Sequence, residues 1–146
     1  MKRKIKNQRG VAAVEFALIL LPLVLLVFGT IEFSTLLYDK AVITNASREG
    51  ARAGILFVND GGVGAGDIAS VVSTYCGNNL ISLGANSGVT TTVTEQGAPP
   101  NRTRTVTVQY RYNFLVLPGF MASLTDGLIL EAVTVMRMED QRDLGG

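Results

Sequence analysis

The first part of the chain is an apolar run that changes into a helical repeat. From Val11 to Ile31 the sequence has 21 residues and one charged side chain, Glu15. A helix of that length is roughly 30 Å long, about the hydrocarbon thickness of a bilayer. The pattern therefore predicts that residues 11–31 cross a membrane as one helix.

Beyond residue 31, apolar residues recur at the three- and four-residue spacing of an amphipathic helix. They are Phe33, Leu36, Leu37, Val42 and Ile43. We predict one helix from about Val11 to about Leu56, whose extramembrane part is residues 32–56. A kink is expected at Pro22, because proline removes a backbone hydrogen bond and clashes with the preceding turn.

Residues 57–146 contain one shorter helical pattern and three alternating or apolar segments, which predict a small globular domain. A second helix is expected over 68–79. Alternating residues at 89–94 and 105–112, and a more apolar segment at 128–138, predict three strands. Short connections favour antiparallel pairing. The expected fold class is α+β and pilin-like, with a second helix and a roughly three-stranded antiparallel sheet packed on the long helix.

Charge predicts the direction of the membrane segment. The first ten residues hold five bases and no acid, whereas the rest hold eight bases and twelve acids. By the positive-inside rule the N-terminus stays in the cytoplasm and the C-terminal domain crosses. The net charge of +1 gives no reason to expect a nucleic-acid partner.

A stripe of small residues follows on the long helix. Ala46, Gly50 and Gly54 lie four residues apart, so they share one helix face and allow another backbone to approach closely. Glycine inside a helix costs ~1 kcal/mol relative to alanine, which implies a packing benefit. Two interpretations stay open: the stripe packs on the chain's own domain, or it contacts another subunit.

The chain is poor in catalytic chemistry. It has no histidine, which removes histidine base catalysis, the Ser-His-acid triad and histidine metal sites. Cys76 is the single cysteine, so it is either a buried thiol or the source of an intermolecular disulfide. We interpret Arg102, Arg104 and Arg111 as a solvated strand face rather than a ligand site. We therefore expect no enzyme, no cofactor and no metal.

The glycine-rich segment 59–66 resembles a phosphate-binding loop only in composition. It lacks the Lys-Ser/Thr that should follow, and Asp67 would repel phosphate at the start of the helix. A plain loop, with Asp67 as the N-cap of the second helix, is the better interpretation.

Three fates of the N-terminus can be compared. A secretory signal peptide needs a small-residue cleavage site after the apolar core, and Gly29 to Glu32 is a poor one. An unprocessed single-pass anchor is the second. Cleavage before the core, after Gly10, fits best because glycine and small residues stand at that junction.

The order of basic leader, Gly10, small residues, Glu15-Phe16 and apolar helix resembles the class III signal of type IV pilins and pseudopilins. The run from Asn45 to Ala53 reads Asn-Ala-Ser-Arg-Glu-Gly-Ala-Arg-Ala. With this run, the chain resembles the TadE-like pseudopilins of the tight-adherence (Flp, type IVc) pilus system. It has no large inserted domain, which favours TadE over TadG-type proteins and leaves TadF as an alternative.

The resemblance implies a minor pseudopilin that helps to build an adhesive pilus. A prepilin peptidase would remove the leader, residues 1–10, by cutting between Gly10 and Val11. Glu15 would be the assembly carboxylate. Implied partners are other pilins and pseudopilins, inner-membrane platform proteins and the lipid bilayer.

The implied location is the bacterial inner membrane, with a cytoplasmic N-terminus and a periplasmic domain that stays there or enters a pilus. A single-pass inner-membrane protein whose periplasmic domain binds or senses a ligand is the alternative. A membrane-tethered enzyme is disfavoured by the missing histidine.

Overall fold

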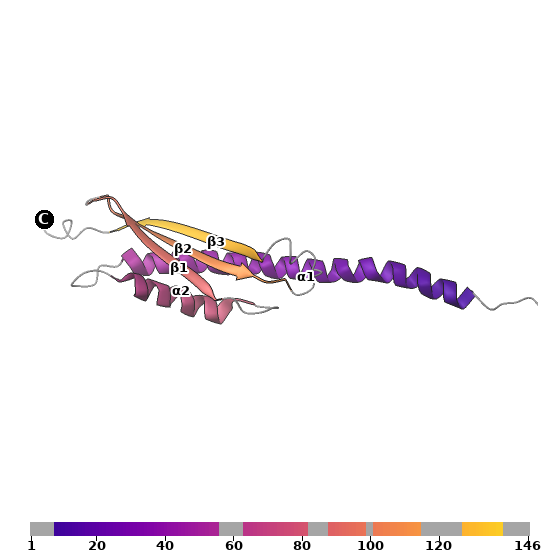
Figure 1. The fold of residues 1–146 in the computed structure, drawn as a ribbon. Helices are drawn as coiled ribbons and strands as arrows, with labels where there is room; N and C mark the ends of the chain where they lie inside the picture. The colour runs from indigo at the N-terminus through magenta and orange to yellow at the C-terminus, as the bar shows by residue number, and fades with distance from the viewer. Residues whose placement is uncertain (1–7, 56–62, 82–87, 99–100, 115–126, 139–146) are drawn as a thin grey trace, which may run out of the picture.

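The computed structural model describes residues 8–55, 63–81, 88–98, 101–114 and 127–138. It confirms the predicted α+β fold of a long helix, a second helix and a three-stranded antiparallel sheet (Figure 1). The five elements in chain order are α1 (Gln8–Ile55), α2 (Ala65–Asn79), β1 (Val89–Gln96), β2 (Thr103–Tyr112) and β3 (Leu128–Arg137).

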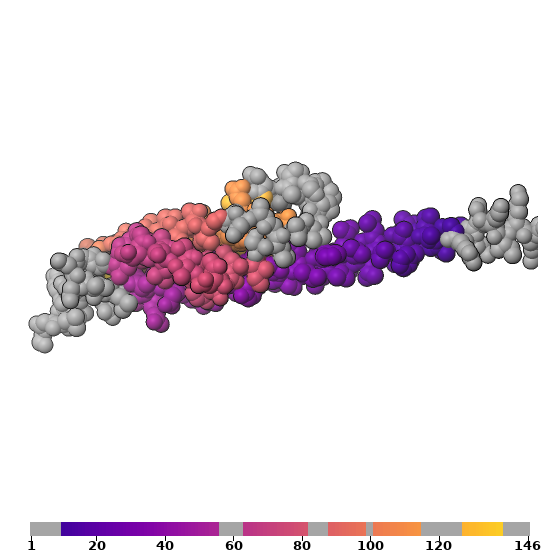
Figure 2. Space-filling view, turned by 90° about the horizontal axis from the view of Figure 1, so that it is seen from below, coloured from indigo at the N-terminus to yellow at the C-terminus, as the bar shows by residue number. Residues whose placement is uncertain are grey.

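Helix α1 has 48 residues and continues through Pro22 without a break. Its N-terminal half projects from the body of the molecule as a bare rod (Figures 1 and 2). Side chains from Val11 to Phe28 are exposed, and the apolar part is long enough to span a membrane. Of the predicted leader, only Gln8, Arg9 and Gly10 belong to the described residues.

The sheet is a meander in the order β1-β2-β3, with both pairs antiparallel. Alternation along β2 decides which side chains enter the core. The buried positions of β2 are Arg104, Val106, Val108, Tyr110 and Tyr112, whereas its other positions are partly or fully exposed. Val106 pairs with Val93 on one side and Thr134 on the other.

Both helices cover one face of the sheet (Figure 1). Helix α1 packs against β2 and β3, and α2 packs between α1 and β1. The residues buried at this junction include Ile43, Ala46, Ile68, Val72, Cys76 and Val108. One apolar core therefore joins the second half of α1 to the rest of the domain.

The start of α2 differs in detail from the prediction. Gly64, not Asp67, is the N-cap, and Asp67 lies three residues into the helix. The Gly64 N–H donates to Asp67 Oδ2 at 3.2 Å, while the Gly64 carbonyl accepts from the Asp67 and Ile68 N–H groups. Asp67 still satisfies a free donor at the helix start, by reaching back to the cap.

Candidate functional site

The predicted processing junction lies on the bare end of α1. Gly10 and Val11 are exposed, and a Cβ placed on Gly10 would meet no atom within 4 Å. Glu15 follows after about one helical turn and is also exposed. Within the described residues, the Glu15 carboxylate makes no hydrogen bond or ion pair. The fold thus leaves all three residues open to another molecule.

The domain first covers α1 at Glu32, the residue directly after the predicted span 11–31. Glu32 is 2% exposed, and its carbonyl accepts a hydrogen bond from the Tyr112 hydroxyl at 3.3 Å. Burial, together with the smaller effect of the nearby charges of Glu32 and Asp39, raises the pKa of Tyr112 to about 12. The end of the predicted membrane segment coincides with the beginning of the folded domain.

A second buried acid ties the end of α2 to α1. Asp39 is fully buried, and its Oδ1 accepts the Ile81 N–H at 3.0 Å. Its Oδ2 has no hydrogen-bond partner in the described structure. Burial raises the pKa of this carboxyl, an effect that the Ile81 hydrogen bond opposes. The sequence analysis missed Asp39, although its seven-residue spacing from Glu32 placed both acids on one helix face.

The small-residue stripe faces α2 and β2 of the same chain. Ala46 is fully buried, and a Cβ on Gly50 would lie 2.6 Å from Val72 Cγ2. A Cβ on Gly54 would lie 2.8 Å from Ile68 Cδ1. Distances under 3 Å between such atoms are steric clashes, so both glycines permit an approach that alanine would hinder.

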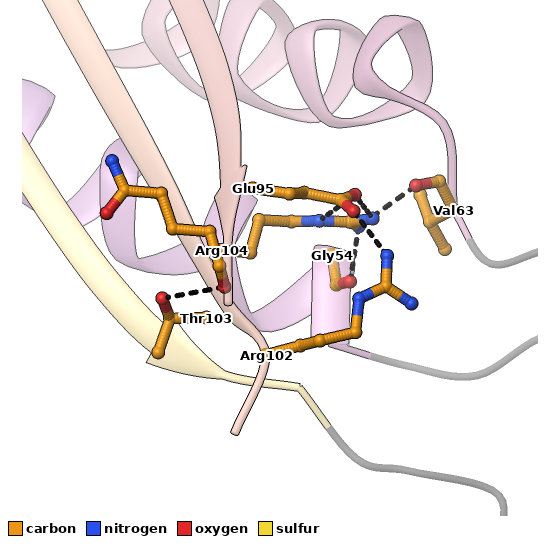
Figure 3. A network of polar contacts seen from close by, with 7 residues as sticks. Gly54, Val63, Glu95, Arg102, Thr103 and Arg104 are labelled. Carbon is orange, nitrogen blue, oxygen red and sulfur yellow. Dashed lines mark hydrogen bonds and ion pairs between the residues drawn. The ribbon is translucent and has the colours of Figure 1, made fainter. Parts of the chain in front are cut away.

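Arg104 joins the ends of three elements (Figure 3). Its Nη1 donates to the Gly54 carbonyl near the end of α1 and to the Val63 carbonyl before α2, the latter at 3.0 Å. Its Nε and Nη2 donate to Glu95 of β1, the former at 3.1 Å. Arg102 also contacts the Glu95 carboxylate, at 2.6 Å.

This network corrects one interpretation of the sequence. Arg104 is 5% exposed, so the idea of a solvated strand face is wrong for this residue. Hydrogen bonds from Arg104, with its charge and that of Arg102, hold the pKa of Glu95 below its usual range. The sequence contained a signal for this burial, because Arg104 lies on the same side of β2 as the inward-facing Val106 and Val108.

The described residues carry little chemistry for catalysis. They contain no group of three histidine, cysteine, aspartate or glutamate side chains that could hold a metal. Cys76 is a buried free thiol in α2, and burial raises its pKa to about 11. A low-pKa, accessible thiol is what nucleophilic chemistry needs, so Cys76 is placed as a core residue.

The described part of the chain is an α+β fold with an N-terminal apolar helix long enough to span a membrane, which fits a membrane-anchored protein. Residues 10–52 match the model of the TadE-like protein family. The resemblance to TadE-like proteins is therefore confirmed along the long helix, and it indicates a structural role in the Tad pilus system. No curated protein and no solved structure gives a significant match.

Proposed function

We propose that this protein is a minor pseudopilin, a structural subunit needed to assemble a tight-adherence pilus and so to attach cells to surfaces. The family match carries the proposal, because it begins at Gly10 and continues through Glu15 to Arg52. The bare apolar half of α1 supports it, since a subunit that inserts its helix among others needs that surface free.

In this proposal the chain has four parts. A cytoplasmic leader, residues 1–10, is removed by a prepilin peptidase. Residues 11–31 cross the inner membrane, and residues 32–56 extend the same helix into the periplasm. Residues 57–146 form the periplasmic domain, which meets other pilins and the platform proteins of the assembly machinery.

Glu15 has a defined role in this proposal. Cleavage after Gly10 creates an α-amino group on Val11, whose reference pKa near ~8 leaves it largely charged at neutral pH. Between packed apolar helices a charged amine needs a carboxylate partner, and removing one member of such a buried pair costs roughly 3–5 kcal/mol. The exposed Glu15 of a neighbouring subunit supplies that partner.

The test is Glu15→Gln in cells that lack the wild-type gene. The variant keeps size and polarity, and it should enter the membrane because a neutral side chain inserts more easily than a charged one. We expect a wild-type protein level but no pili and no co-purification with other pilins. Glu131→Gln, at an exposed position of β3, is the control, and cells that carry it should form pili normally. Normal piliation with Glu15→Gln would refute an assembly role of the carboxylate.

A further inference from the structure

Four exposed apolar side chains lie at the end of the domain that faces the predicted membrane segment. Phe33 and Leu37 belong to α1, and Leu128 and Ile129 begin β3. Their exposed fractions are 61%, 52%, 39% and 55%. We call these four residues the apolar collar.

Contacts across the fold place both halves of the collar at the same end. Leu128 pairs with Tyr112, and the Tyr112 hydroxyl bonds to the Glu32 carbonyl, one residue before Phe33. Farther along, Lys40 Nζ donates to the Glu131 carbonyl of β3. The end of β2 and the start of β3 therefore lie beside the middle of α1 (Figure 1).

The collar has the depth of a membrane interface. At 1.5 Å per residue, Phe33 and Leu37 lie roughly 3 and 9 Å beyond Ile31 along the helix. Helical side chains also lean toward the N-terminus, which here is toward the membrane. The interfacial layer on each side of the hydrocarbon is roughly 5–7 Å thick, so Phe33 lies within it and the side chain of Leu37, leaning toward the membrane, reaches its outer edge.

The distribution of charge fits a lipid surface. The two acids of α1 at this end, Glu32 and Asp39, are buried. Exposed bases stand beside the collar: Lys40 on α1, and Arg111, which pairs with Ile129. Glu131 is exposed there too, and it accepts a hydrogen bond from Gln109 Nε2 at 2.6 Å. Apolar groups rimmed by long basic side chains are typical of surfaces that lie in a lipid interface.

We propose that the apolar collar docks on the interface of the membrane that α1 crosses, on the side of the domain. The inference rests on the proposed placement of residues 11–31 in the bilayer, and not on the role in a pilus. Docking would fix the domain against the membrane in the unassembled subunit. Leaving the membrane would expose the collar, so assembly must cover it with contacts from other subunits.

Tryptophan fluorescence provides the test, because the chain contains no tryptophan. Ile129→Trp places a single reporter in the collar, and the full chain is reconstituted in vesicles with or without lipids brominated near the headgroup. Val135→Trp is the matched control, since Val135 is 59% exposed on the same strand and roughly 20 Å farther along it. Leu23→Trp, near the middle of the predicted span, reports on the membrane segment itself in vesicles whose lipids are brominated deep in the acyl chains. Circular dichroism checks that each variant is folded.

We expect brominated lipid to reduce the emission of Ile129→Trp by about twofold, as for a side chain in the interface, and to leave Val135→Trp nearly unchanged. Equal emission changes in these two variants, with strong quenching of Leu23→Trp, would overturn the docking proposal and leave the membrane placement of residues 11–31 intact. A blue-shifted Ile129→Trp that lipid does not quench would show that protein covers the collar, for example a second copy, and would also overturn it. Loss of quenching in Leu23→Trp would instead refute the membrane placement on which the inference rests.

Discussion

Gly50 of α1 and Val72 of α2 are so close that no side chain fits between them. A Cβ on Gly50 would lie 2.6 Å from Val72 Cγ2 and 3.3 Å from Ile68 Cγ2. The two helices meet at this point around a fully buried core. Helix α2 can therefore pack this closely on α1 only because residue 50 is a glycine.

Gly50→Ala is expected to destabilise the protein. Overpacking costs ~1–3 kcal/mol, which outweighs the gain of up to ~1 kcal/mol from replacing glycine in a helix. Gly77→Ala is the control, because a Cβ on Gly77 of α2 meets no atom within 4 Å. It should be neutral or slightly stabilising. Urea unfolding of the full chain in detergent measures both, and equal stabilities would contradict the close packing.

The larger substitution Gly50→Leu separates stability from assembly. It should harm folding or piliation more than Ala41→Leu, whose site on α1 is exposed. Because Gly50 packs against Val72 of the same chain, we expect the Gly50 variant to be degraded in cells. A Gly50 variant that accumulates at the wild-type level without pili would instead point to a contact between subunits. Wild-type levels and wild-type pili with both variants would show that the stripe needs no small residue.

Arg104→Met is expected to lower the free energy of unfolding by about 2 kcal/mol, because the Gly54 and Val63 carbonyls lose a charged donor. Arg102→Met should cost less than ~1 kcal/mol, since the Arg102 side chain is 41% exposed and exposed ion pairs contribute little. Unfolding monitored by circular dichroism ranks the two variants. A cost for Arg102→Met as large as that for Arg104→Met would contradict the role of Arg104 as the joint between α1, α2 and β1.

The stability of the protein should depend on pH through Asp39. Burial raises the pKa of its carboxyl above the ordinary value of 3.8, so the folded state binds a proton that the unfolded state has released. This contribution is fully present below 3.8 and is lost as the pH rises through the folded pKa. The pKa of Glu95 is lowered in the folded state, so its contribution to stability has the opposite sign and is lost as the pH falls below its ordinary value of 4.5. A scan above pH 4.5 therefore reports mainly on Asp39.

Asp39→Asn should remove this component of the pH dependence. The asparagine oxygen can still accept the Ile81 N–H, and no buried charge remains. We therefore expect a flatter profile above pH 4.5 and a stability at pH 7 at least equal to that of the wild type. Parallel profiles of variant and wild type would show that Asp39 does not titrate in this range.

The sequence predicted the elements whose apolar periods are strong, namely α1, α2 and the three strands. It did not predict the burial of Asp39 and Arg104, because their hydrogen-bond partners, such as Ile81 and Gly54, lie far along the chain. The spacing of the two residues indicates the face on which each lies, but not the partners that they find there. Gly10 and Glu15 are a different case, since their proposed partners belong to other molecules and the folded chain leaves them exposed.

The N-terminus of the mature protein tests the central claim most directly. Mass spectrometry of protein from piliated cells should identify a chain that begins at Val11, because the exposed glycine junction is the proposed substrate of a prepilin peptidase. A bulky substitution at Gly10 should leave the full-length chain in the membrane, since a large side chain at the cut would hinder entry into the protease. Recovery of only the intact Met1 form from cells that make pili would contradict the assignment as a processed pseudopilin.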